Sequence, residues 1–176
     1  MEYRRILPVL SSSMRPINLM EETRFPGMVD VYMSQLDAHL LCVVNWDDEE
    51  NLVTNICVEK LLPDYVIQGQ KYLVCDYYAG EYYANVSTDQ NITMKAIAPH
   101  GANVFKVVKM QAKPIVVKST GHYSMGGEIE CLEMVGDKLH YIIDNAFDCP
   151  IQYEVLLPDG RVVSLIINHG KQEGML

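Results

Sequence analysis

Four consecutive acids follow the only tryptophan of the chain in the stretch VVNWDDEENLV, residues 43–53. Carboxylates that are held at fixed separations can bind metal ions or act as general acids and bases. The acids at 47–50 are adjacent, so their side chains point in different directions and each is easily hydrated. This pattern favours a solvated acidic turn between two strands over a catalytic or metal site. Trp46 either covers the rim of a core or stacks on a ligand.

Four tyrosines flank the Ala79-Gly80 dipeptide in the segment CDYYAGEYYANV, residues 75–86. A tight turn at this dipeptide predicts two tyrosines on each face of a hairpin. Aromatic faces stack against sugar rings, whereas cross-strand aromatic pairs also stabilise a hairpin without any ligand. Both roles stay open. The candidate carbohydrate-contact residues are Trp46, Tyr77, Tyr78, Tyr82 and Tyr83.

The remaining reactive residues form no pattern typical of an active site. None of the five histidines has a metal-ligand spacing to another histidine, and there is no C-x-x-C pair. The chain also lacks a nucleophile elbow, a phosphate loop and a dinucleotide-binding motif. We therefore predict no catalytic residue, no metal ligand and no cofactor. A minor alternative is an enzyme that uses His100, His122 and the acids.

The five cysteines are odd in number, distant in sequence and mostly placed in apolar runs. Free cysteine packs as a small hydrophobic residue. Buried free thiols in a reducing, cytoplasmic setting are therefore expected rather than disulfides.

Composition excludes several classes of partner. The chain has 176 residues, of which 49% are hydrophobic, which is enough for a genuine core. Its formal net charge is −9 and its bases are scattered along the sequence, so nucleic acid is not an expected partner. No apolar run is long enough to predict a membrane span.

Short apolar runs separated by turn residues predict the fold class. From Met28 onward, runs rich in Val, Ile, Leu and Tyr alternate with Gly, Pro, Asn or Asp about every eight to twelve residues. This spacing predicts an all-β protein, an antiparallel β-sandwich with extra C-terminal hairpins. The runs at 51–58 and 91–97 are among the expected strands, and the glycine-rich stretch at 120–128 is expected to connect two strands. We expect a lead-in segment at 1–27, the sandwich at 28–110 and additional antiparallel strands at 111–176, in the same domain or a small second sheet.

Two hairpins have turns that predict their registers. In LEMVGDKLHY, a Gly136-Asp137 turn pairs Met134 with Leu139, and Leu132 with Tyr141. In EVLLPDGRVV, a two-residue turn at Asp159-Gly160 predicts pairing of Leu157 with Val162 and of Tyr153 with Ile166. The second hairpin is apolar on both faces, which predicts burial on two sides.

Four short motifs occur in a characteristic order over roughly residues 6–108. They are a proline-rich exit with Arg15-Pro16, Asn45-Trp46 before the acidic loop, a Tyr-x-Val-x-Asp strand at 72–76, and a Pro-His-Gly turn at 99–101. Together they resemble the carboxyl-terminal end of alpha-galactosidases of the melibiase and raffinose-synthase kind. In those glycoside hydrolases a TIM barrel is followed by an all-β domain that is mainly structural.

The resemblance implies a non-catalytic domain. The family's catalytic aspartates lie on barrel strands, and this sequence contains no barrel, so no catalytic residue is carried over. The expected partner is the catalytic TIM barrel of the same parent enzyme, and galactosides and a second copy of the chain stay open as partners. The alternative function is a carbohydrate-binding module that uses the tyrosine hairpin or Trp46.

Overall fold

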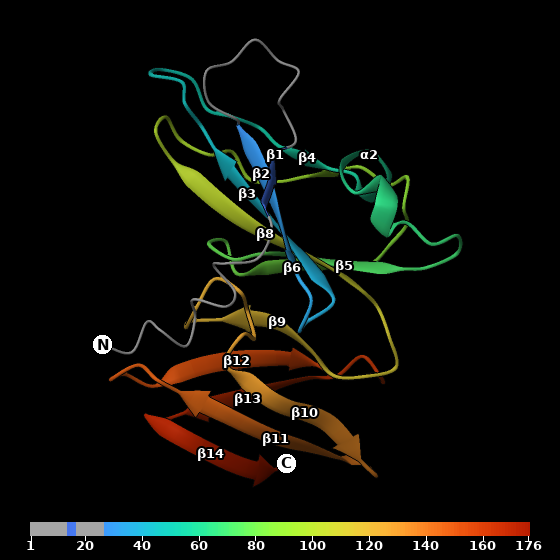
Figure 1. Cartoon of the computed structure of the whole chain (residues 1–176), viewed down its shortest axis with the longest axis vertical. Helices are drawn as coiled ribbons and strands as arrows, with labels where there is room; N and C mark the ends of the chain where they lie inside the picture. Colours follow the sequence, from blue (N-terminus) through green and yellow to red (C-terminus); the bar gives the residue numbers. More distant parts are fainter. Residues whose placement is uncertain (1–13, 17–26) are drawn as a thin grey trace. The chain divides into compact units, whose positions relative to one another are not determined.

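The computed structural model describes residues 14–16 and 27–176 (Figure 1). Contacts divide the chain into two compact units, Ser12–Met110, here the N-terminal unit, and Gln111–Leu176, here the C-terminal unit. Both are built from antiparallel sheets, which confirms the predicted all-β class. Most of the predicted lead-in at 1–27 lies outside the described residues. No helix among the described residues has both the length and the apolar character needed to cross a membrane.

The N-terminal unit contains a six-stranded antiparallel sheet in the order β1-β2-β3-β8-β5-β6. Its longest pairing joins β3 to β8, from Ala38 opposite Val108 to Val44 opposite Ala102. The edge strand β1 was not predicted; it pairs with β2, and an edge position tolerates Pro16, which cannot donate a backbone hydrogen bond. The strands are β1 Met14–Pro16, β2 Met28–Met33, β3 Ala38–Val44, β5 Tyr72–Asp76, β6 Glu81–Val86 and β8 Ala102–Lys109.

Short elements pack against one face of this sheet and close its core. They are β4 Asn55–Ile56, α2 Val58–Leu61, η2 Pro63–Tyr65 and β7 Ile92–Thr93. Ile56, Val58 and Leu62 are buried against Leu41 and Phe105 of the sheet. The predicted strand at 51–58 is therefore mostly wrong, because the chain makes one helical turn that buries Val58 and Leu62 before Pro63 starts η2. The strand predicted at 91–97 is reduced to β7 and one bridge at Ile97.

The C-terminal unit contains two three-stranded antiparallel sheets, β10-β11-β14 and β13-β12-β9. Asn145, at the end of β11, donates its side-chain amide to the carbonyl of Ile167 at the end of β13, at 3.0 Å, and so links the two sheets. The last strand, β14, was not predicted because its sequence, GKQEGM, has no apolar alternation. The strands are β9 Ile115–Ser119, β10 Ile129–Val135, β11 Lys138–Asn145, β12 Ile151–Leu156, β13 Val162–Ile167 and β14 Gly170–Met175.

The register predicted for the β10–β11 hairpin is confirmed, with Leu132 opposite Tyr141 and Met134 opposite Leu139. The register predicted for the β12–β13 hairpin is wrong by one residue, because Tyr153 lies opposite Leu165 rather than Ile166. The loop contains Pro158 as well as Asp159 and Gly160, and the N–H of Leu157 donates to the carbonyl of Arg161 at 2.8 Å. A three-residue loop with a left-handed glycine, here Gly160 at φ 88°, sets this pairing.

The corrected register also changes the burial of the β12–β13 hairpin. Tyr153, Leu165 and Ile167 share a buried face, whereas Ile166 is 68% exposed on the other face. The predicted burial on two sides is therefore wrong. A one-residue shift in pairing moves the partner of each side chain to the opposite face of the sheet.

Candidate functional site

The acidic stretch forms a turn whose first carboxylate caps the backbone. Asn45 is only 3% exposed, and its side-chain amide donates to the carbonyls of Glu50 at 2.8 Å and Ile97 at 3.0 Å. The Asp47 carboxylate accepts the backbone N–H groups of Glu50 at 2.7 Å and Glu49 at 2.8 Å. These hydrogen bonds lower the pKa of Asp47. Asp47 is thus used to build the turn.

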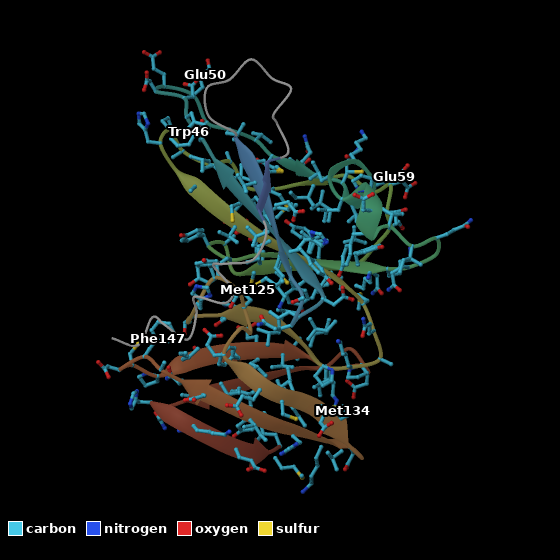
Figure 2. All side chains as sticks on the ribbon, in the orientation of Figure 1. Trp46, Glu50, Glu59, Met125, Met134 and Phe147 are labelled. Carbon is cyan, nitrogen blue, oxygen red and sulfur yellow. The ribbon has the colours of Figure 1, made fainter. Side chains whose placement is uncertain are left out.

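Trp46 stands at this turn, 55% exposed to solvent. Figure 2 shows Trp46 and Glu50 together where the chain leaves β3. His100 lies nearby, because its Nε2 is 3.2 Å from Oδ1 of Asp48 in an exposed ion pair. Its own turn is tight: His100 has a φ of 57°, and a Cβ on Gly101 would come within 2.8 Å of the Ala98 carbonyl oxygen.

The tyrosine segment differs from the predicted two-residue hairpin. Residues 77–80 form the turn, so Tyr77 and Tyr78 lie in the loop rather than on the strand. Their rings meet edge to face with centroids 5.0 Å apart, and Tyr78 is 68% exposed. Tyr82 and Tyr83 are adjacent on β6 and point to opposite faces, where Tyr83 packs against the core. The prediction of two tyrosines on each face is therefore wrong.

A buried carboxylate explains the longer turn. Asp76, the last residue of β5, is buried and accepts both a hydrogen bond from the Asn103 side-chain amide at 3.1 Å and one from the Ala79 N–H at 2.9 Å. Gly80 then closes the loop with a φ of 64°. Aspartate side chains commonly hold loops in this way. Asp76, like Asp47, has a structural role.

Trp46 and Tyr78 belong to the same end of the six-stranded sheet. Strands β3 and β5 both pair antiparallel with β8, so they run in the same direction and their C-terminal residues lie at the same end of the sheet. Val44 lies opposite Ala102, and the N–H of Tyr77 donates to the Val104 carbonyl at 3.0 Å. Three of the five predicted contact residues, Trp46, Tyr77 and Tyr78, therefore share this end, and Tyr83 is taken up by the core.

A partly buried histidine, His39, lies on the core face of the same sheet. His39 Nδ1 is 2.8 Å from Oδ1 of Asp30, and the His39 ring packs against Tyr65 with centroids 4.4 Å apart. Lys109 Nζ lies 4.1 Å from the centroid of the Tyr65 ring. The sequence carried the signal, because Asp30 and His39 alternate with apolar residues on the buried faces of β2 and β3. Buried polar groups of this kind anchor a core when their hydrogen bonds are made.

The two histidines of the minor enzyme hypothesis lie in different units. His100 is exposed in the N-terminal unit, whereas His122 is buried in the C-terminal unit. Burial lowers the pKa of His122, and its Nδ1 accepts the N–H of Ser124 at 3.2 Å. The segment that contains it, residues 120–128, connects β9 to β10, as predicted for this glycine-rich stretch.

The thiols of all five cysteines are free. Cys57 and Cys75 are buried, as expected for free thiols in apolar runs, and burial raises the pKa of Cys75 to about 12. Cys149 is exposed, because it follows the end of β11 in a turn. The prediction of buried thiols therefore holds for only part of the set.

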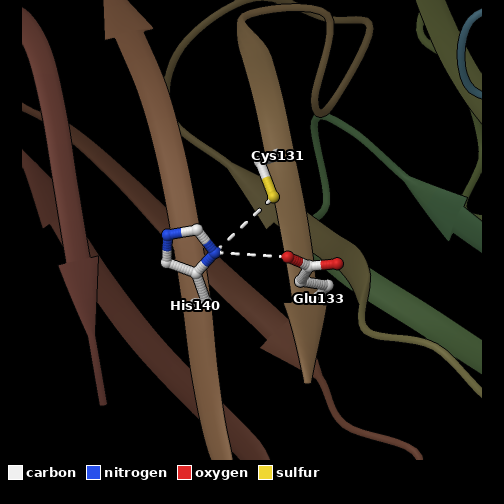
Figure 3. A group of neighbouring side chains, drawn as sticks. All are labelled: Cys131, Glu133 and His140. Carbon is white, nitrogen blue, oxygen red and sulfur yellow. Dashed lines mark hydrogen bonds and ion pairs between the residues drawn. The ribbon is translucent and has the colours of Figure 1, made fainter. Parts of the chain in front are cut away.

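One cluster of metal-ligating side chains was missed by the sequence prediction. Glu133 on β10 lies opposite His140 on β11, and Cys131 is on the same face of β10 (Figure 3). His140 Nδ1 is 3.7 Å from Cys131 Sγ and 3.4 Å from Glu133 Oε1. The signal was in the register: pairing Leu132 with Tyr141 and Met134 with Leu139 places Glu133 opposite His140 on the other face.

The charge around this cluster is negative. His140 Nε2 is 3.2 Å from Oε1 of Glu173, on β14. Hydrogen bonds to Glu173 and Glu133 raise the pKa of His140. Desolvation, together with the charge of Glu133, raises the pKa of the Cys131 thiol. Two carboxylates and a thiol therefore surround one imidazole.

Comparison with known proteins does not assign a family to the chain. No family model matches the sequence. No curated protein matches it at a significant level.

Proposed function

We propose that this chain is a non-catalytic, all-β C-terminal domain of an alpha-galactosidase-like glycoside hydrolase, and that it supports a catalytic barrel of the same parent enzyme. The observation that supports this proposal is that residues of the sequence motifs have structural roles. Asn45, Asp76 and Gly101, which carry the resemblance, are each placed where the fold needs that residue type. The motifs therefore mark structure rather than chemistry.

Three aspartates of the N-terminal unit also have structural roles. Asp47 caps its turn, Asp76 is buried under the turn at 77–80, and Asp30 is paired with the partly buried His39. A retaining glycosidase needs two carboxyl groups that face a bound sugar from opposite sides. Carboxylates engaged in backbone hydrogen bonds inside turns serve the fold instead, and catalysis is assigned to the barrel.

The proposal is tested in the coding DNA upstream of Met1. It predicts an open reading frame that continues into this one and encodes barrel strands that end in aspartates. Co-expression of that barrel with residues 1–176 as a separate chain should give a complex on size-exclusion chromatography and a higher barrel Tm. An upstream region without such a frame, or a barrel whose Tm is unchanged by the chain, contradicts the proposal.

A second candidate, a carbohydrate-binding module, is favoured by one observation. Trp46 and Tyr78 are 55% and 68% exposed at the same end of the sheet. Exposed aromatic rings supply contact area at a small cost in conformational entropy. Isothermal titration with galactosides should then give a binding signal that Tyr78→Ala abolishes.

Tyr32→Ala is the matched control for this titration, because Tyr32 is also partly exposed but lies at the opposite end of β2 and β3. Binding that survives Tyr78→Ala, or that both variants abolish, removes the module hypothesis. A negative sugar titration does not bear on the proposed support of a barrel, which is tested separately by co-expression.

A further inference from the structure

We propose that Cys131, Glu133 and His140 form a Zn²⁺ site on the outward face of the sheet β10-β11-β14. This site lies in the C-terminal unit and is independent of the proposed support function. The three residues supply sulfur, oxygen and nitrogen ligands, which is the donor set that Zn²⁺ prefers. The ligand atoms of all three lie within 4.8 Å of one another.

The strands position these side chains on a face that a metal ion can reach. Leu139 and Ile143 of β11 are buried on the inner face. Because successive residues of a strand point to opposite faces, His140 points outward. The His140 side chain is 19% exposed and that of Glu133 is 60% exposed. The imidazole is therefore held by its neighbours, whereas the carboxylate is free to adjust its rotamer.

The distances fit one metal ion without movement of the backbone. A tetrahedral zinc with ordinary bond lengths separates its sulfur and nitrogen ligands by about 3.6 Å, and nitrogen and oxygen ligands by about 3.3 Å. The observed separations from His140 Nδ1 are 3.7 Å to the Cys131 sulfur and 3.4 Å to the Glu133 oxygen. The exposed Glu133 side chain brings the remaining sulfur-to-oxygen distance into range by rotation.

A fourth residue, Glu173, contacts the imidazole nitrogen that does not face the proposed metal. Glu173 Oε1 lies 3.2 Å from His140 Nε2, so it accepts the N–H of that nitrogen when Nδ1 carries the metal. A carboxylate on the far nitrogen of a ligating histidine fixes the tautomer and increases the basicity of the ligand. This contact comes from β14, a different strand from the ligands, and is independent of their mutual spacing.

The charges also favour a divalent cation. A thiolate at Cys131 and a carboxylate at Glu133 together neutralise Zn²⁺, and three protein ligands leave one coordination position for water. Mg²⁺ and Ca²⁺ prefer oxygen ligands alone, so they are expected to bind poorly to a thiolate and an imidazole.

The site is tested on the full chain with Zn²⁺ and with Co²⁺ as a spectroscopic probe under reducing conditions. We expect one equivalent of Zn²⁺ by isothermal titration, no comparable signal with Mg²⁺, and a sulfur-to-cobalt charge-transfer band. Zn²⁺ should also slow alkylation of Cys131, read by mass spectrometry, while Cys149 continues to react. No Zn²⁺ binding, or an unchanged alkylation rate at Cys131, overturns the proposal without any variant.

Variants locate the site. Cys131→Ser should remove the charge-transfer band, and Glu173→Gln should weaken Zn²⁺ binding about 10- to 100-fold, as loss of such an outer carboxylate does. Cys149→Ser is the matched control, because Cys149 is a second accessible thiol near His169 and Asp148. Circular dichroism checks that each variant is folded. A band that survives Cys131→Ser but is lost in Cys149→Ser places the metal elsewhere and contradicts the assignment.

Discussion

At the scale of single residues, the polar side chains of the N-terminal unit mainly satisfy backbone groups. Asn45 is the best example, because its amide donates to two carbonyls and its oxygen accepts the N–H of Asp47 at 3.0 Å. Such a side chain holds the acidic turn against the isolated bridge residue Ile97. The Asn-Trp pair could be recognised in the sequence, but the three partners of Asn45 could not, since Ile97 is distant in the chain.

Removal of the Asn45 side chain should destabilise the fold. Asn45→Ala removes the side-chain hydrogen bonds to the carbonyls of Glu50 and Ile97, and we expect the free energy of unfolding to fall by roughly 1–3 kcal/mol. Urea denaturation measures the change. Asn51→Ala is the control, because Asn51 is exposed in the same loop. Equal stability of the two variants contradicts the anchoring role of Asn45.

Asp47 predicts a dependence on pH. Its pKa is lowered in the folded state by the N–H groups of Glu50 and Glu49, so its stabilising effect is present above the unfolded-state pKa of about 3.9 and is lost as pH falls through the lower folded-state pKa. Wild type should therefore exceed Asp47→Asn in stability at neutral pH. This difference should shrink in acid, and a difference that is constant with pH argues against the effect.

The thiols should react in an order set by burial. Cys149 should be alkylated in the folded chain, whereas Cys75, buried and with a pKa of about 12, should react only after unfolding. Mass spectrometry after brief exposure to iodoacetamide, with and without urea, distinguishes the two. Rapid native modification of Cys75 is incompatible with the described packing of β5.

At the scale of elements, turn length decided which predictions held. The Gly136-Asp137 turn gave the right register because its two residues suffice to connect the strands. Pro158 adds a third residue to the next hairpin loop, and Asp76 holds Tyr77 and Tyr78 out of their strand. Neither effect is visible in the alternation of apolar residues. The helical turn α2 was missed for a related reason, since its Val58 and Leu62 are apolar like those of a strand.

The loop of the β12–β13 hairpin gives the prediction for this scale. Gly160 has a φ of 88°, and a Cβ added there would meet no atom within 4 Å, so Gly160→Ala should cost about 1–2 kcal/mol of unfolding free energy through backbone strain alone. Asn tolerates the left-handed region better than Ala does, so Gly160→Asn should be less harmful. Thermal unfolding of the two variants decides, and an alanine variant as stable as wild type refutes the three-residue loop.

At the scale of the whole molecule, the sequence predicted the all-β class, which depends on repeated local patterns. It did not predict the Cys131–Glu133–His140 cluster, which needs a strand register, nor the contact with Glu173, which needs the unpredicted β14. The exposed aromatic residues Trp46 and Tyr78 belong to the N-terminal unit, and the Cys131–Glu133–His140 cluster belongs to the C-terminal unit. Sugar binding and metal binding are therefore separately testable.

We propose that Asp47 and Asp76 build turns and that the acids at 47–50 do not perform hydrolysis. The most direct measurement is turnover of a nitrophenyl alpha-galactoside by the purified chain, beside a variant in which the acids at 47–50 are replaced by their amides. We expect no turnover above that of buffer from either protein. Hydrolysis by the wild type that the amide variant loses would contradict the claim.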